Sequence, residues 1–211
     1  MNAASLSNYL SLAVVMVFAQ NIVFSYGLGT DELLRITARP KEFTLFGCIL
    51  TFFTVTGALG GMLVDDICAA LNITGALYTG KAFGYLLFLV AAYLITTLIL
   101  RRFFHSFYRY ISRALPMAVF GTATLGAPLI LSRISQTTLD IIFTNHYAAG
   151  LVFGLSAGIG YLLAMLLLYE GMRQIEAMDL PEAFRGLPAR FIYVGLLALA
   201  FVGISGRALS I

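Results

Sequence analysis

The sequence predicts an all-α polytopic membrane protein with six transmembrane helices arranged as two inverted three-helix repeats. The chain has 211 residues, of which 60% are apolar and only 11% charged, and its mean hydropathy is +0.93. Soluble globular proteins do not have this composition. Six stretches lack charged side chains, and most are close to the ~20 residues that cross a bilayer. They are residues 9–29, 43–64, 82–100, 114–132, 147–169 and 191–206.

The first stretch carries two adjacent amides, Gln20 and Asn21, in the middle of an apolar run. It also contains Gly27 and Gly29, where a helix is readily interrupted. It lacks the basic start and the small-residue cleavage site of a signal peptide, so we expect it to be retained as the first helix. A polar, glycine-containing midpoint indicates either an internal site or amides that only bond to a neighbouring helix, and both alternatives remain open.

A short cytoplasmic helix is expected after the first stretch, because Thr30-Asp31-Glu32 is a typical helix start and Pro40 a typical stop. The second stretch contains Gly57, Gly60 and Gly61, which favour close helix contact. After the third stretch, residues 101–113 interleave arginine with aromatic side chains. This pattern is typical of an anchor to membrane lipid at the headgroup level, with a partner-docking surface as the alternative.

The fourth stretch is expected to be broken, because Pro116 and Pro128 bracket a centre rich in glycine and threonine. The first and fourth stretches open the two halves, which lie at about 5–104 and 110–207 of a single domain spanning 1–211. Since each half has an odd number of spans, the halves are inverted, and matching interruptions predict a midplane binding site or ion path. Its candidate residues are Gln20, Asn21, Ser25, Gly27, Gly29, Gly121, Thr122 and Thr124.

The fifth stretch carries Gly150, Gly154 and Gly158 at four-residue spacing, which predicts a tight helix contact. A charged cytoplasmic loop is expected from Glu170 onward, followed by the sixth helix.

The distribution of lysine and arginine predicts the orientation. Of the thirteen basic residues, only Lys81, Arg133 and Arg207 fall on the side shared by the two chain ends, and the other ten fall on the opposite side. The positive-inside rule then places both termini outside, in the cytoplasmic (inner) membrane of a bacterium or archaeon. No basic run resembles a nucleic-acid surface.

Neither a catalytic nor a metal centre is evident. Cys48 and Cys68 lie 20 residues apart, or about 30 Å along a helix, too far for a disulfide or one metal centre. We expect Cys48 to be buried and Cys68 to be an unpaired thiol on the outer side. The spans contain no acidic or basic residue in their interior, which disfavours a proton relay through membrane carboxylates.

Several motifs resemble the membrane subunits of the Rnf and Na⁺-translocating NADH:quinone reductase (Nqr) complexes. They are DLPEAFRG at 179–186, GLLALAFVGISG at 195–206, Gln20-Asn21 with Gly29, and Leu115-Pro116 with Leu125-Gly126. The similarity covers essentially the whole chain and is closest to the A-type Rnf subunit and its NqrE-like counterpart. It implies a homologous partner of opposite topology, further Rnf-like subunits, and a [2Fe–2S] cluster ligated by cysteines from the interrupted first and fourth helices.

The matching ligand positions in this chain are Asp31 and Thr122, neither of which is a cysteine. Iron–sulfur clusters of this kind need thiolate ligands, so we expect the chain to bind no cofactor of its own. Two functions remain open besides a purely structural role. One is a membrane subunit of an Rnf-like ion-translocating electron transport complex without its own cluster. The other is a cysteine-free secondary transporter or channel that acts with an inverted homologous partner.

Overall fold

The computed structural model describes residues 3–36, 43–71, 80–133, 145–178, 181 and 184–205, and all the regular structure in these ranges is helical. This confirms the expected all-α class. The elements are α1 (Ala3–Val14), η1 (Val15–Ala19), α2 (Thr30–Ile36), α3 (Phe43–Ala70), α4 (Lys81–Phe103), α5 (His105–Ile111), α6 (Ala114–Val119), α7 (Thr122–Arg133), α9 (His146–Ala177) and α10 (Leu187–Ser205).

Four helical segments of the described chain are long and apolar enough to cross a membrane: α3, α4, α6 together with α7, and α9. The first and sixth expected spans form shorter apolar helices, Ser7–Ala19 and Leu187–Gly203. The first helix therefore ends at Ala19, well before the expected residue 29. Its last turn, η1, is a π-helix, and the backbone leaves the helical path at Gln20.

Two helices run further than the charge pattern predicts. Helix α3 continues through Asp65 and Asp66 to Ala70, because both carboxylates find partners at that end. Helix α9 continues to Ala177, so the expected loop does not begin at Glu170. Charged side chains at Glu170 and Arg173 are exposed and do not interrupt the backbone hydrogen bonds. The expected re-entrant link between α3 and α4 falls largely on 72–79, outside the described residues.

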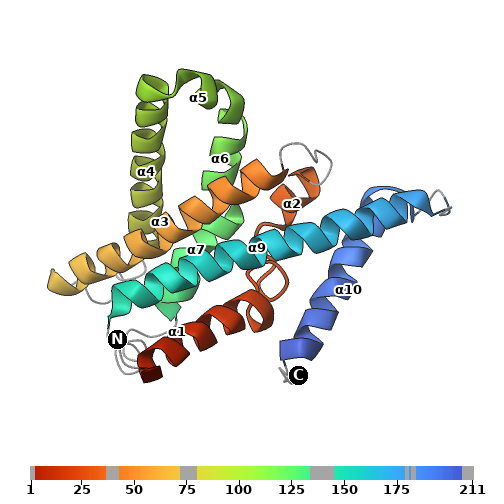
Figure 1. Cartoon of the computed structure of the whole chain (residues 1–211), viewed down its shortest axis with the longest axis horizontal. Helices are drawn as coiled ribbons and strands as arrows, with labels where there is room; N and C mark the ends of the chain where they lie inside the picture. The colour runs from red at the N-terminus through yellow and green to blue at the C-terminus, as the bar shows by residue number, and fades with distance from the viewer. Residues whose placement is uncertain are drawn as a thin grey trace.

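Helices α3 and α9 form the centre of the fold and run antiparallel to each other (Figure 1). Gly154 lies against the α3 backbone so closely that an added Cβ would be 2.6 Å from the Cα of Val55. Gly158 faces the side chain of Thr51 in the same way, and the Thr54 hydroxyl donates to the carbonyl of Gly154 at 3.2 Å. The glycine spacing on the fifth span therefore does what the sequence predicts, which is to allow close helix contact.

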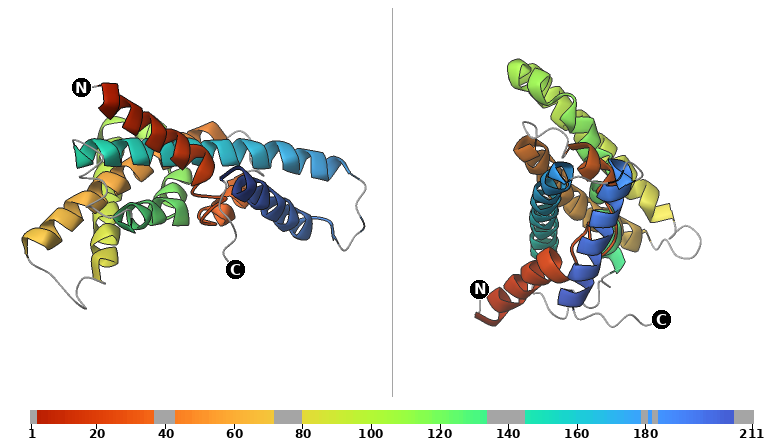
Figure 2. Two further views of the ribbon diagram at one scale, coloured as in Figure 1. Left: turned by 90° about the horizontal axis from the view of Figure 1, so that it is seen from below. Right: turned by 90° about the vertical axis from the view of Figure 1, so that its right-hand side faces the viewer.

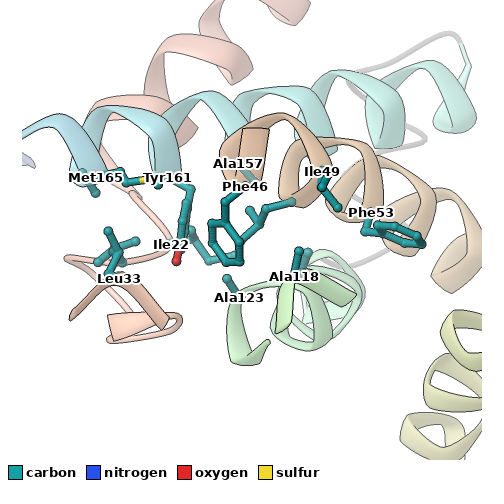
Figure 3. Close-up of a cluster of buried hydrophobic side chains, with 14 of the residues drawn as sticks. Ile22, Leu33, Phe46, Ile49, Phe53, Ala118, Ala123, Ala157, Tyr161 and Met165 are labelled. Atoms are coloured by element: carbon teal, nitrogen blue, oxygen red, sulfur yellow. The ribbon is translucent and has the colours of Figure 1, made fainter. Parts of the chain in front are cut away.

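The buried core lies between this pair and the two interrupted helices (Figure 3). Phe46 and Phe53 of α3 are fully buried, as is Tyr161 of α9. The rings of Phe46 and Tyr161 have centroids 6.3 Å apart. The small side chains of Ala118 and Ala123 let α6 and α7 approach these rings.

The remaining helices pack around the central pair. Helices α1 and η1 lie against α9, whereas α7 lies against α3. Helix α4 contacts α3, and α10 contacts η1 and α9, so α4 and α10 stand on different sides of the molecule (Figures 1 and 2). Each interrupted helix thus packs on the long central helix of the other half of the chain.

One end of the bundle gathers three segments that the sequence assigns to one side of the membrane. Asp65 of α3 accepts a hydrogen bond from Tyr85 at 2.7 Å and pairs with Lys81 at 2.9 Å. Its neighbour Asp66 accepts a hydrogen bond from Tyr147. At the same end, Tyr9 near the N-terminus donates to the carbonyl of Asn145 at 3.4 Å, which brings three connections together as six spans require.

We predict that Gly154→Ala destabilises the protein by about 1–3 kcal/mol, because the new methyl group meets backbone atoms that cannot rotate away. Thermal unfolding of the purified protein in detergent measures the effect. Gly195→Ala is the matched control, since an added Cβ there meets no atom within 4 Å. Equal unfolding temperatures for the two variants would contradict the close α3–α9 contact.

Candidate functional site

The candidate site is the place where the interruptions of the first and fourth helices meet. After Gln20 the chain runs through turns to Gly29, with positive φ of 71° at Gly27 and 78° at Gly29. In the fourth stretch only Phe120 and Gly121 separate α6 from α7. Both expected interruptions are present, and the first begins earlier than the glycines indicate.

Asn21 closes the break in the first helix with its side chain. It is fully buried, and its amide group donates to the carbonyls of Val17 at 3.0 Å and Gly160 at 2.9 Å. Its carbonyl oxygen accepts from the backbone N–H groups of Val23 at 2.9 Å and Phe24 at 3.4 Å. Asn21 therefore has the structural role that the sequence left open for the two amides. Gln20 is half-buried, and its side chain makes no hydrogen bond with the described residues.

Two predicted site hydroxyls satisfy carbonyls that the breaks leave free. Ser25 donates to the carbonyl of Ala19, the last residue of η1, at 3.1 Å. Thr124 is fully buried and donates to the carbonyl of Ala118 in α6 at 2.6 Å. Backbone groups released by an interrupted helix must find partners within the protein when water is absent. These two hydroxyls provide such partners.

Gly29 and Thr122 join the two interruptions directly. The N–H of Gly29 donates to Thr122 Oγ1 at 2.7 Å, and the Tyr161 hydroxyl donates to the carbonyl of Gly29 at 3.2 Å. An added Cβ at Gly29 would lie 2.5 Å from the Tyr161 ring and 2.9 Å from Ala123. With its positive φ, this position fits only glycine.

The fourth group at this junction is Glu32, which the sequence analysis did not select. Its Oε1 accepts from the N–H of Thr122, the first residue of α7, at 2.9 Å. Gly121 makes room for it, because an added Cβ there would lie 2.9 Å from this oxygen. We expected Glu32 in a water-facing cytoplasmic helix, and this was wrong: its exposed fraction is 7%, and the following Leu33 is fully buried.

The reason for the error is that Leu33-Leu34 was treated as part of a polar connection. Both leucines belong to the core, and they turn α2 so that Glu32 faces the break in the fourth span. The Thr30 hydroxyl donates to the carbonyl of Gly27 at 3.2 Å, which closes the preceding turn. An acidic residue directly before an apolar pair was the signal for a buried carboxylate.

The junction does not fit an iron–sulfur cluster. Asp31 and Thr122 supply a carboxylate and a hydroxyl, both exposed on the surface of the single chain. The two cysteines lie on α3, separated by most of its length, and no three His, Cys, Asp or Glu side chains of the described residues converge on a metal position. Cys48, expected to be buried, is exposed because it points away from the side of α3 that packs on α9, whereas Cys68 is partly exposed.

Two interrupted helices that meet inside a helical bundle define a class of polytopic membrane proteins with a site between discontinuous helices. Within this class, the chain belongs to the Rnf-Nqr family of membrane subunits. The family model "Rnf-Nqr subunit, membrane protein" matches residues 9–208.

Several curated relatives are similar to the chain over their whole length. The E-type (NqrE) component of the Na⁺-translocating NADH-quinone reductase from Marinobacter nauticus is 28% identical over 97% of this chain and 100% of its own. The proteins of the same name from Histophilus somni and Neisseria meningitidis are 29% and 27% identical, each over 95% of this chain and 98% of their own.

We predict that Asn21→Ala strongly destabilises the protein, because each buried group that loses its partner costs about 1–3 kcal/mol and Asn21 serves four. Gln20→Ala removes a neighbouring amide without such partners and should change stability by less than about 0.5 kcal/mol. Thermal unfolding in detergent compares them. A larger effect of Gln20→Ala would contradict the structural role of Asn21.

Proposed function

We propose that this chain is an integral membrane subunit of an ion-translocating electron transport complex of the Rnf/Nqr type. It supplies a membrane scaffold and part of an ion path, while electrons travel through other subunits. The observation that carries the proposal is the junction of Gly29 and Thr122, which joins two interrupted helices in a chain that matches the family over nearly its whole length. A secondary transporter is not favoured, since the relatives that match over the full length are named as reductase subunits.

The six spans form two inverted repeats, at about 5–104 and 110–207 of one domain. Two features support this arrangement. The central helices α3 and α9 are antiparallel (Figure 1), and each interrupted helix packs on the central helix of the other repeat. A pseudo-twofold relation between the repeats requires this exchange.

A homologous subunit of opposite topology covers the junction. Tyr26, Asp31, Phe120 and Thr122 are exposed on the single chain, and a carboxylate that faced lipid at this depth would be costly. A second membrane subunit with its own interrupted helices would bury this surface. Elsewhere the chain contacts lipid directly, as with the exposed Phe103, Phe104 and Tyr110 beside the arginines of α4 and α5.

The ion path runs past the junction, and the predicted site residues divide into two groups. Gly27, Gly29, Gly121 and Thr122 form the junction itself, where backbone and hydroxyl oxygens are suited to a hard cation such as Na⁺. Asn21, Ser25 and Thr124 hold the interrupted backbone in place, and Gln20 lies beside them. Asp31 and Thr122 occupy the family's cluster positions without thiolates, and the chain binds no cluster.

The chain lies in the inner membrane with both termini outside. Ten of the thirteen basic residues fall on the other side, and the contacts of Asp65 with Lys81 and of Tyr9 with Asn145 support a common side for the N-terminus and two connections. These contacts are symmetric with respect to inside and outside. The direction therefore rests on the positive-inside rule.

Affinity purification of the chain from its native membrane in mild detergent tests the proposed function. We expect flavin- and iron–sulfur-carrying subunits to remain bound together with one homologous membrane subunit, as mass spectrometry would identify. Recovery of the homologous subunit alone would refute a redox complex.

Labelling of Cys68 tests the orientation. In a Cys48→Ser variant we expect a membrane-impermeant maleimide to modify Cys68 in spheroplasts, because this residue lies near the outer end of α3. The Cys68→Ser variant is the matched control, since Cys48 faces the membrane interior. Labelling of Cys68 only after the membrane is permeabilised would reverse the proposed topology.

A further inference from the structure

Glu32 is the buried group at the junction whose function the fold does not account for. One of its oxygens, Oε1, caps α7 by accepting from the N–H of Thr122 at 2.9 Å. The other, Oε2, is buried and has no hydrogen-bond partner among the described residues. A carboxylate oxygen that is buried without a partner is costly, so its presence indicates a group that is absent from the single chain.

The space beside Glu32 is kept open by small residues. Gly121 lies so close that a Cβ there would be 2.9 Å from Oε1. The Thr122 hydroxyl lies on the same junction and is exposed on the surface that we assign to a partner subunit. Oxygen atoms of three kinds, from carboxylate, hydroxyl and backbone carbonyl, are therefore available at one point between the interrupted helices.

The charges at this point are unbalanced. The carboxyl groups of Asp31 and Glu32 are near enough to interact with each other. Arg35, one turn further along α2, interacts favourably with Asp31. Among the described residues, Glu32 forms no ion pair. Asp31 and Arg35 compensate each other, so one negative charge remains on Glu32.

We propose that the Glu32 carboxylate, with Asp31 beside it, forms a binding site for a single monovalent metal cation at the junction of the two interrupted helices. The chemistry of the oxygens selects a hard cation, because soft metals prefer thiolate or imidazole and neither is present among the described residues of the junction. One uncompensated charge matches a monovalent ion better than a divalent one.

This inference deepens the proposed function and rests on it for the choice of Na⁺. The position where the family resemblance implies a thiolate-bound cluster would carry a cation bound by oxygen atoms. A proton on Glu32 would balance the same charge, and the experiment distinguishes the two.

The test is equilibrium binding of ²²Na⁺ to the complex purified from its native membrane, in a background of choline chloride. Glu32→Gln removes the charge and keeps the size of the side chain, and its amide oxygen still accepts from Thr122. We expect this variant to lose one Na⁺ site per copy of the chain or to bind Na⁺ at least about tenfold more weakly. Glu170→Gln is the matched control, because Glu170 is exposed on α9.

Three results would overturn the inference while leaving the proposed function intact, provided that the redox subunits still co-purify. The first is equal Na⁺ binding by the wild type and Glu32→Gln. The second is the absence of competable ²²Na⁺ binding in the wild type, which would assign the charge balance to a proton. The third is loss of the homologous subunit from Glu32→Gln with no change in Na⁺ sites, which would make the partner's surface the missing group. Na⁺ binding that depends on Glu32 in a preparation without redox subunits would support the site and refute the complex.

Discussion

The constraint on which this structure depends is that backbone groups freed by an interrupted helix must be satisfied inside the protein. In hydrocarbon an unpartnered N–H or C=O costs several kcal/mol, and water is not available to replace it. The polar side chains at the centre of the bundle answer this requirement one by one. Asn21 serves four backbone groups, Ser25 and Thr124 each serve a carbonyl, and Thr122 accepts from Gly29.

Because those side chains are committed to the backbone, they leave the two interruptions rigidly joined. Tyr161 reinforces the joint from α9, where its hydroxyl donates to Gly29 and its ring packs on Phe46. The close contact of α3 with Gly154 fixes the distance between the two central helices. The junction is thus held from both halves of the chain, which is the geometry that a midplane site between inverted repeats needs.

The same joint shows how a family scaffold can persist while its metal chemistry changes. At the two cluster positions the chain carries Asp31 and Thr122, and Thr122 has become part of the hydrogen-bond network that joins the helices. A hydroxyl and a carboxylate are hard oxygen ligands, whereas an iron–sulfur cluster requires sulfur. The architecture therefore tolerates the replacement, although the cofactor implied by the resemblance does not fit it.

The sequence by itself determined the all-α membrane class, the family, the two interruptions and the glycine contact, because each depends on composition, local propensity or spacing along one helix. Only the tertiary structure decided what the polar residues do. Asn21 and Gln20 are adjacent and chemically alike, yet one is fully buried against Gly160 and the other is not, since the direction of each side chain depends on where the helix breaks. Glu32 is the clearest case: its role arises from Thr122, 90 residues away, which no local pattern could bring to its side.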